Sequence, residues 1–205
     1  MIKYMFQFIE SIRVSNWEPE NLHFHQLRMN RTLMHYGQQP YLNLIDLFDS
    51  TCINNDNVIK WRIVYSLEQI IDISYTDYSI KNIGSVALAN LRGHQYDFKF
   101  EDRGWITTLL NTAGADEIIM CDDGVLKDAS YANIVFYDGA NWYTPENPLL
   151  EGTRRAQLLL EGKIQLMDIR LSDLKKFDQV KFINALMSWE ESPTFQVARI
   201  NMSTV

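Results

Sequence analysis

The chain has 205 residues, of which 46% are hydrophobic and 22% are charged. These fractions are typical of folded globular domains, so they exclude a disordered chain, a collagen-like repeat and a coiled coil. Its 26 acidic and 19 basic side chains give a formal net charge of -7, which argues against a nucleic acid or an anionic membrane as the main partner. The length allows one large domain or two small ones.

Cysteine content and hydropathy indicate the compartment. Cys52 and Cys121 are too few for a disulfide framework and lack the spacing of a zinc site. The first residues contain no basic region followed by an apolar run, so we predict no secretory signal, and no apolar stretch approaches the roughly 18 residues that span a bilayer. The four histidines form no ligand array. We therefore expect a soluble, cytoplasmic protein without a bound metal.

The first half of the chain predicts strands around one long helix. Residues 5–14 alternate as a strand does, and this places Glu10 in an otherwise apolar row. Asn21 is a cap for a helix that runs to about Tyr36 and ends at Gly37. A short helix is expected near residues 42–48. Alternating Trp, Ile and Tyr residues then predict two neighbouring strands at about 61–65 and 71–75.

The second half is richer in turn signals. A helix is expected over about 102–113, and two Asp-Gly turns predict hairpins, one between residues 118–121 and 125–129 and one between 134–137 and 142–144. Gly152 opens an apolar helix, Ser172 caps a short helix that ends at Phe177, and strands close the chain. Because residues 92–95 look like a crossover, we expect a domain boundary near residues 92–96.

Lys99 is unusual because it lies between Phe98 and Phe100. Aromatic neighbours can remove water from an ammonium group and lower its pKa, as a Schiff-base lysine requires. The alternative is an edge-strand lysine with its charged end in water, which is the more common arrangement.

Two stretches could bind an anion. The helix start at Gly152, Thr153, Arg154 and Arg155 offers backbone N–H groups, a hydroxyl and two guanidiniums, which together bind phosphate well. The alternative is an ordinary helix start with a surface basic pair. Arg28, on a mostly apolar helix face, is either a phosphate ligand or a member of a helix-face ion pair.

Two carboxylates also call for an explanation. Asp128 ends a strand, where it could hold a protonated pyridine nitrogen or bond to nearby backbone groups. Glu10 lies within an apolar row, so it needs a ligand or a partner, and Arg13 or a distant lysine is a candidate partner.

Taken in order, these segments resemble the class IV aminotransferases, the fold-type IV enzymes that use pyridoxal 5'-phosphate (PLP). Each piece alone is weak, but their order and spacing over most of the chain make the combination specific. The resemblance implies an α/β (α+β) fold of two domains. Residues 1–92 would form a small N-terminal α/β domain, and residues 93–205 a larger C-terminal cofactor-binding domain with a barrel-like mixed sheet. The matching segments are FIESIRV (8–14), HQLRM (25–29), KFEDR (99–103), ADE (115–117), DASYANIVF (128–136), TP (144–145), LLEGTRR (149–155) and NALM (184–187).

The same resemblance implies roles for individual residues. Lys99 would hold the cofactor covalently and move the substrate's α-proton, and Glu10 is the second expected catalytic residue. Asp128 would face the pyridine nitrogen, where the family usually has a glutamate, so the side chain is shorter by one bond of about 1.5 Å. The cofactor phosphate would be bound by Arg28, Gly152, Thr153, Arg154, Asn184 and Ala185.

The reaction is less specified than the cofactor. The Lys-x-x-Asp-Arg run at Lys99 resembles 4-amino-4-deoxychorismate lyases, which release pyruvate and 4-aminobenzoate for folate synthesis. Glu10 instead resembles transaminases of the branched-chain or D-amino-acid type. A third alternative is a non-catalytic relative, suggested by Asp128 and by a start close to the 8–14 segment. In each case the resemblance implies a homodimer, and for the enzymes an amino-acid-like substrate.

Overall fold

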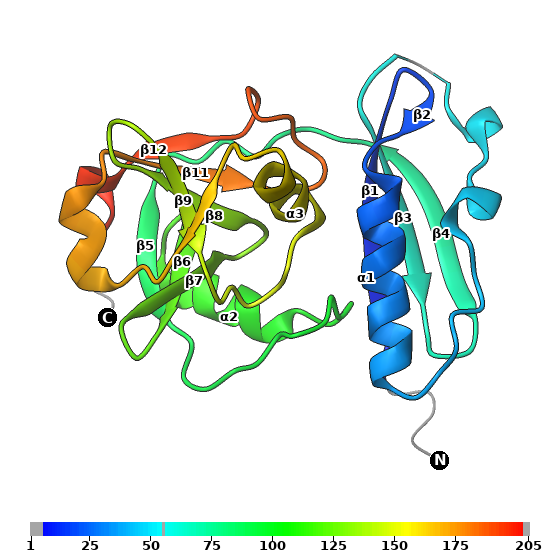
Figure 1. Ribbon diagram of the computed structural model, residues 1–205, viewed down its shortest axis with the longest axis horizontal. Helices are drawn as coiled ribbons and strands as arrows, with labels where there is room; N and C mark the ends of the chain where they lie inside the picture. Colours follow the sequence, from blue (N-terminus) through cyan, green and yellow to red (C-terminus); the bar gives the residue numbers. More distant parts are fainter. Residues whose placement is uncertain (1–5, 55, 203–205) are drawn as a thin grey trace. The chain divides into compact units, whose positions relative to one another are not determined.

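The computed structural model describes residues 6–54 and 56–202, and these form two compact units (Figure 1). The first unit contains residues up to 80 together with 98–102, and the second contains 81–97 and the chain from 103 onward. The predicted boundary near residues 92–96 differs from this division. The difference arises because residues 86–90 form a strand of the second unit, whereas residues 98–102 return to the first.

The first unit is a four-stranded antiparallel sheet in the order β2-β1-β3-β4, with helix α1 packed against β1. The strands predicted from alternation are confirmed, although Met5, at the start of the first predicted strand, lies outside the described residues. A short 3-10 helix replaces the helix expected near residues 42–48. The elements are β1 (Phe8–Ser15), β2 (Glu18–Pro19), α1 (Leu22–His35), 3-10 helices at Leu44–Leu47 and Ser50–Cys52, β3 (Ile59–Tyr65) and β4 (Ile70–Asp77).

Helix α1 begins and ends where the sequence predicts, but its first turn lacks the predicted side-chain cap. Asn21 occupies the N-cap position with φ 58°, and its side chain makes no capping hydrogen bond to the helix. Gly37 has φ 76°, the left-handed conformation that glycine adopts readily after a helix. The inner face of α1 places Met29 and Leu33 in the core of the first unit beside Trp61, and this packing fixes the rotation of the helix.

The second unit contains two open sheets, and in its described residues the strand orders do not close into the barrel-like sheet that we expected. A three-stranded sheet has the order β5-β6-β7, and a five-stranded sheet has the order β10-β9-β8-β11-β12. Both predicted Asp-Gly hairpins are present, as β6 with β7 and β8 with β9. The strands are β5 (Val86–Asn90), β6 (Glu117–Asp122), β7 (Val125–Ala129), β8 (Asn133–Tyr137), β9 (Trp142–Pro145), β10 (Gln165–Met167), β11 (Gln179–Ile183) and β12 (Thr194–Gln196).

The helices of this unit are α2 (Gly104–Ala113), α3 (Thr153–Leu160) and 3-10 helices at Leu171–Lys176 and Val197–Arg199. The prediction that Ser172 caps the first 3-10 helix is wrong. Arg170 is the N-cap residue, and the Asp173 carboxylate accepts its backbone N–H at 3.0 Å. An acidic side chain three positions into the helix thus moves the start two residues earlier.

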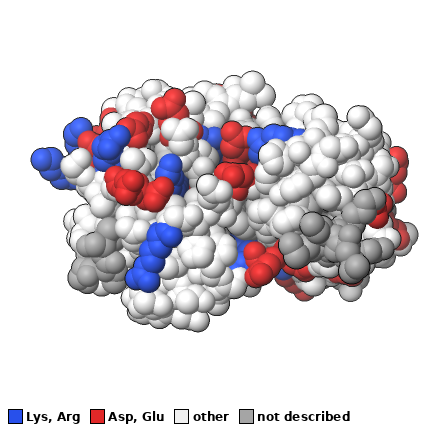
Figure 2. All heavy atoms as spheres, turned by 90° about the horizontal axis from the view of Figure 1, so that it is seen from below, with Lys and Arg blue, Asp and Glu red and all other residues white. Residues whose placement is uncertain are grey.

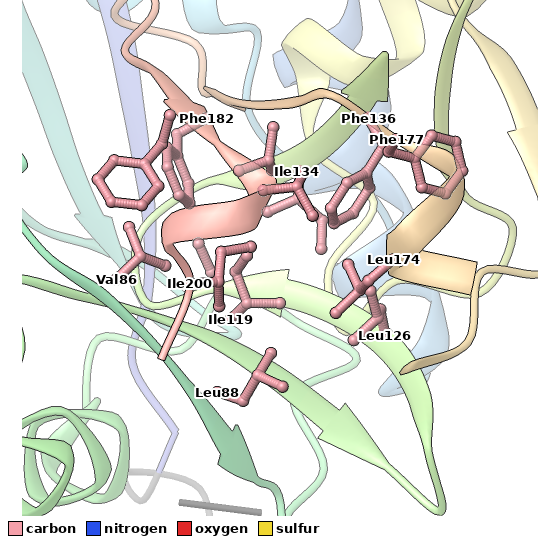
Figure 3. Packing of buried hydrophobic residues seen from close by; sticks show 14 of the residues in the cluster. Val86, Leu88, Ile119, Leu126, Ile134, Phe136, Leu174, Phe177, Phe182 and Ile200 are labelled. Atoms are coloured by element: carbon pink, nitrogen blue, oxygen red, sulfur yellow. The ribbon is translucent and has the colours of Figure 1, made fainter. Parts of the chain in front are cut away.

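The main core of the second unit combines side chains from both sheets (Figure 3). Leu88, Ile119 and Leu126 come from the three-stranded sheet, and Ile134 and Phe182 come from the five-stranded sheet. All five are at most 2% exposed. Burial on this scale stabilises the pairing of β8 with β11, on which the candidate site of this unit depends.

The surface carries charges of both signs. On the face drawn in Figure 2, basic and acidic side chains are interspersed among uncharged residues. Within residues 6–54 and 56–202, no helix has the length and apolar content that crossing a bilayer requires.

Candidate active site

Lys99 lies in a short segment that extends the first sheet beside β1. The Ile9 N–H donates to the Lys99 carbonyl at 2.9 Å, and the Glu101 N–H donates to the Gln7 carbonyl at 2.8 Å. Phe100 therefore pairs opposite Phe8. Lys99 is half-buried. It is therefore neither an edge-strand lysine that lies wholly in water nor a lysine that is fully desolvated.

The two phenylalanines beside Lys99 act as anchors. The Phe98 ring lies 4.5 Å from the ring of His35 and 5.5 Å from that of Tyr36, at the end of α1. The Phe100 ring lies 5.2 Å from that of Phe8. Aromatic pairs at these separations stabilise their packing, so the backbone on both sides of the lysine is fixed.

The partners of Glu10 are Arg28 and His25, not Arg13 or a lysine. Arg28 donates from Nε to Oε1 at 2.9 Å and from Nη2 to Oε2 at 2.5 Å, while His25 Nδ1 lies 2.6 Å from Oε2. Glu10 and His25 are 0% exposed and Arg28 is 7% exposed. Arg28 is thus part of an ion pair, but one between helix α1 and strand β1 rather than along the helix face.

Burial and charge set the ionisation of this cluster. Burial by itself raises the pKa of Glu10, but the charge of Arg28 and the hydrogen bonds from His25 and Arg28 lower it to about 2. Burial lowers the pKa of His25, and the charges of Arg28 and Lys99 act in the same direction against the opposing effect of Glu10. His25 is therefore neutral at pH 7, and it donates its Nδ1–H to an ionised Glu10.

Asp128 is the buried carboxylate of the second unit. Its Oδ1 accepts from Asn133 Nδ2 at 2.7 Å and its Oδ2 accepts from the Leu150 N–H at 2.9 Å. Burial raises the pKa of Asp128 to about 7, although these hydrogen bonds and the charge of Arg155 oppose the change. Such a carboxylate gains stability from a cationic group placed against it.

The start of α3 is packed tightly against β8. A Cβ atom on Gly152 would lie 1.9 Å from Asn133 Oδ1, so only glycine fits at this approach. Neither arginine that follows belongs to a surface pair. Arg155 Nη2 donates to the Pro145 carbonyl at 2.8 Å and fixes the end of β9, whereas Arg154 Nη1 donates to Gln157 Oε1 at 2.8 Å within the helix.

The Asn184–Ala185 turn follows β11 directly. Asn184 Oδ1 accepts from the Leu186 N–H at 2.8 Å, which closes the turn. The preceding residue, Ile183, is paired with Asn133, and Asn133 also bonds Asp128 and contacts Gly152. The structure thus brings Asp128, the start of α3 and this turn together around Asn133.

Lys181 holds the loop that follows this turn. Its Nζ donates to the Trp189 carbonyl at 3.0 Å and to the Ser192 carbonyl at 3.4 Å, and it lies 4.8 Å from the centroid of the Trp189 ring. Burial lowers the pKa of this amine. The arrangement is a structural clamp, formed by hydrogen bonds and a cation–π contact.

Glu117 is a buried carboxylate to which sequence reasoning gave no role. Its Oε1 accepts from the N–H groups of Ile118 and Ser130, both at 2.8 Å, and burial raises its pKa. Arg103 Nη2 donates to the carbonyl of the same Ser130. Both the N–H and the carbonyl of Ser130, two residues after Asp128, are therefore hydrogen-bonded to side chains. In the sequence, the sign of this buried carboxylate was a lone glutamate directly before the apolar residues 118–120.

The candidate residues thus form two groups. Within the first unit the structure brings together Glu10, Arg28 and the unpredicted His25, with Lys99 close enough for its charge to affect the pKa of His25. Within the second unit it gathers the remaining predicted residues, which are Asp128, Gly152, Thr153, Arg154, Asn184 and Ala185.

Comparison with known proteins gives the family. The model of the class IV aminotransferases matches residues 105–190. An uncharacterized protein of Haemophilus influenzae is 35% identical over 187 residues, which cover 89% of this chain and 98% of that protein. The chain belongs to the class IV aminotransferase family. The matched residues include Asp128 and the start of α3, but they begin after Arg28 and Lys99.

Solved structures agree with this assignment. A Haemophilus somnus protein, provisionally named a 4-amino-4-deoxychorismate lyase, is 27% identical with a TM-score of 0.81, covering 89% of this chain and 97% of that one. An aminotransferase of Brucella abortus bound to PLP has a TM-score of 0.71 at 12% identity, covering 95% of this chain and 82% of that one. The second likeness concerns the fold alone. Together they confirm the mixed α/β fold of the fold-type IV enzymes.

Proposed function

We propose that this class IV aminotransferase family member is a PLP-dependent 4-amino-4-deoxychorismate lyase, which releases pyruvate and 4-aminobenzoate. One observation carries the proposal. Lys99, followed by an Asp102–Arg103 pair that resembles the Asn-Arg pair of such lyases, is anchored to β1 beside the buried cluster that contains Arg28. An amine and a guanidinium are thus present in one unit, as a cofactor with an aldehyde and a phosphate requires.

The chemistry of the donor set fits PLP. Lys99 supplies a primary amine for the aldehyde, and Asp128 supplies a buried carboxylate whose pKa of about 7 would fall beside a pyridinium nitrogen. Arg28 and the first N–H groups of α3 are donors suited to a phosphate dianion. The close contact of Gly152 with Asn133 explains why the start of α3 is glycine. Asn184 and Ala185 complete the proposed phosphate-binding set.

The roles of the protein follow from these contacts. Bound PLP would supply an electron sink for the bonds at the substrate's α-carbon. Lys99 Nζ would hold the cofactor and take the α-proton as a general base. Asp128 would keep a proton on the pyridine nitrogen. Arg28, oriented by Glu10, would bind the phosphate and so fix the cofactor for the reaction.

A transaminase is the second candidate, because the buried Glu10 is a transaminase-like feature and aminotransferases share the fold. The two reactions share the removal of the α-proton by Lys99. They differ in that the lyase needs no second substrate, whereas a transaminase passes the amine to a 2-oxo acid. A cytoplasmic homodimer that acts on an amino-acid-like substrate in folate biosynthesis belongs to the lyase proposal and rests on the resemblance alone.

The cofactor is tested by absorbance and by chemical trapping. Protein purified with PLP should be yellow, with a band near about 420 nm that disappears on treatment with borohydride. Mass spectrometry should then locate the reduced cofactor on Lys99, and Lys99→Ala should remain colourless. Lys175→Ala, at an exposed position, is the matched control and should stay yellow. A colourless wild-type protein that takes up no added PLP would support the non-catalytic alternative.

The reaction is tested with two substrates. Incubation with 4-amino-4-deoxychorismate alone should release 4-aminobenzoate and pyruvate in equal amounts. If this substrate is unchanged, while an amino acid and 2-oxoglutarate exchange the amino group, the transaminase reading replaces the lyase reading.

A further inference from the structure

Arg28 faces Glu10 with only one edge of its guanidinium. The contacts to Glu10 use Nε and Nη2, so in the planar group the Nη1 side points away from the carboxylate. In the proposed function, the phosphate of PLP would be bound from this side. The direction in which Arg28 offers that side therefore depends on the plane of the Glu10 carboxylate.

A glutamate carboxylate does not fix its own plane. Rotation about its last torsion is broad, because the bond joins a tetrahedral carbon to a planar one. A paired arginine limits this rotation, but the two planes can still turn together. A third donor from a different direction is needed to hold both.

His25 is that third donor. Its Nδ1 lies 2.6 Å from Glu10 Oε2, the oxygen that Arg28 Nη2 also contacts. The imidazole is 0% exposed, so its own orientation is fixed by packing. His25 and Arg28 lie three positions apart on α1, so both approach β1 from the same helix face.

We propose that His25 is a positioning residue for cofactor binding: its Nδ1–H fixes the plane of the Glu10 carboxylate, and Glu10 in turn fixes the Arg28 guanidinium toward the phosphate. The inference rests on the proposed function, in which Arg28 binds the phosphate of PLP. It gives His25 a role that acts through Glu10 and Arg28, with no contact between His25 and the cofactor.

The test is a titration of the cofactor-free protein with PLP, in which the quenching of tryptophan fluorescence measures binding. His25→Leu, of nearly the same size as histidine, removes the donor, and the smaller His25→Asn retains an N–H close to the position of Nδ1. We expect His25→Leu to raise the dissociation constant for PLP about tenfold and His25→Asn to keep it within about threefold of wild type. His23→Leu, at an exposed position of α1, is the control and should leave it unchanged.

A double-variant cycle separates positioning from general damage. In the Arg28→Lys background the two-point contact with Glu10 is lost, so adding His25→Leu should change the dissociation constant by less than about twofold. An equal loss in both backgrounds would overturn the proposal, as would a normal dissociation constant for His25→Leu. Equal losses for the Leu and Asn variants would overturn it as well.

The controls keep the two proposals distinct. If wild-type protein does not bind PLP, the proposed function fails. If wild type binds PLP and Arg28→Lys weakens binding while His25→Leu does not, only the role of His25 fails. Circular dichroism shows whether each variant is folded. If His25→Leu is unfolded, His25→Gln takes its place, because it displaces the donor, and its dissociation constant should then lie above that of His25→Asn.

Discussion

Asp128 combines deep burial with neutral hydrogen-bond donors. It is 4% exposed, and it accepts hydrogen bonds from the Asn133 amide and the Leu150 N–H. Glu10, which is also buried, is paired with a guanidinium, and its pKa is lowered instead of raised. Two carboxylates of one chain thus differ because only one has a cation bonded to it.

The raised pKa of Asp128 predicts a pH dependence of stability. The pKa rises from 3.8 to about 7, so between these values the folded state holds a proton that the unfolded state has released. The free energy of unfolding should therefore fall as the pH rises through this window, by up to about 1.4 kcal/mol per pH unit from this group. Asp128→Asn does not titrate and should lack this component.

Urea unfolding of the cofactor-free protein between about pH 5 and pH 8 measures this difference. Asp97→Asn, at an exposed position, should keep the wild-type slope. Equal pH slopes for wild type and Asp128→Asn would contradict the raised pKa.

The sequence indicated that the buried carboxylate of Glu10 requires a partner, but it did not indicate which residues those partners are. The apolar row around Glu10 showed that a partner was required, but Arg28 and His25 are 18 and 15 positions away. Only the packing of α1 on β1 brings them together. The local candidate, Arg13, instead bonds Glu20 at 2.9 Å. Spacing within a strand gives the face of a side chain, but not what a distant helix places against that face.

At the scale of the elements, the start of α3 depends on the close approach of Gly152 to the Asn133 side chain of β8. Asn133 is held by Nδ2 bonds to Asp128 Oδ1 and to the Leu150 carbonyl at 2.7 and 2.8 Å, so it cannot simply turn away from a new methyl group at position 152. Gly152 is therefore required by its neighbour rather than by its own backbone, which has φ -71°.

Gly152→Ala should consequently weaken both stability and cofactor binding. Displacing Asn133 removes the donor to Asp128, and we expect a loss of about 1–3 kcal/mol in the free energy of unfolding together with a higher dissociation constant for PLP. Gly84→Ala is the matched control, because its Cβ would lie 3.2 Å from Asp116 Oδ2 rather than 1.9 Å from a fixed amide. Equal effects of the two substitutions would contradict the role of this contact.

Hairpins and helices were predicted better than caps. The turn at Asp123 and Gly124 has φ 45° and 76°, the conformation that an Asp-Gly pair favours, so the signal is local and sufficient. The cap at Ser172 failed because Asp173 competes with it, a choice that depends on which backbone N–H each side chain reaches. The open sheets also differ from the expected barrel, because closure depends on pairings between distant strands that hairpin signals do not specify.

At the scale of the whole molecule, the two units have separate hydrophobic cores. Leu33 belongs to the cluster of the first unit and Leu126 to that of the second, and both are 0% exposed. No residue is shared between these two clusters. Local unfolding is therefore expected to follow the units.

Two identical substitutions test this expectation. Leu33→Ala and Leu126→Ala should each cost about 2–5 kcal/mol. In hydrogen–deuterium exchange, the first should speed exchange in α1, β1 and β3, and the second in β7, β8 and β11. If either substitution speeds exchange equally in both units, the chain unfolds as a single cooperative body.

The predicted boundary near residues 92–96 does not describe the path of the chain between the two units. The crossover-like residues 92–95 lie inside the second unit, and residues 98–102 return to the first because Phe98 and Phe100 pack on α1 and β1. That return depends on aromatic contacts between residues more than 60 positions apart in the sequence, and no local pattern predicts such contacts.

The order of synthesis gives this return a further consequence. Residues 1–80 leave the ribosome before the segment that completes their sheet, and the intervening 22 residues, from 81 to 102, take about one to four seconds to translate. During this interval the edge of β1 at Phe8 and Ile9 lacks the strand that later covers it. A nascent chain at this stage exposes an unpaired apolar edge, the kind of surface that chaperones bind and that promotes aggregation.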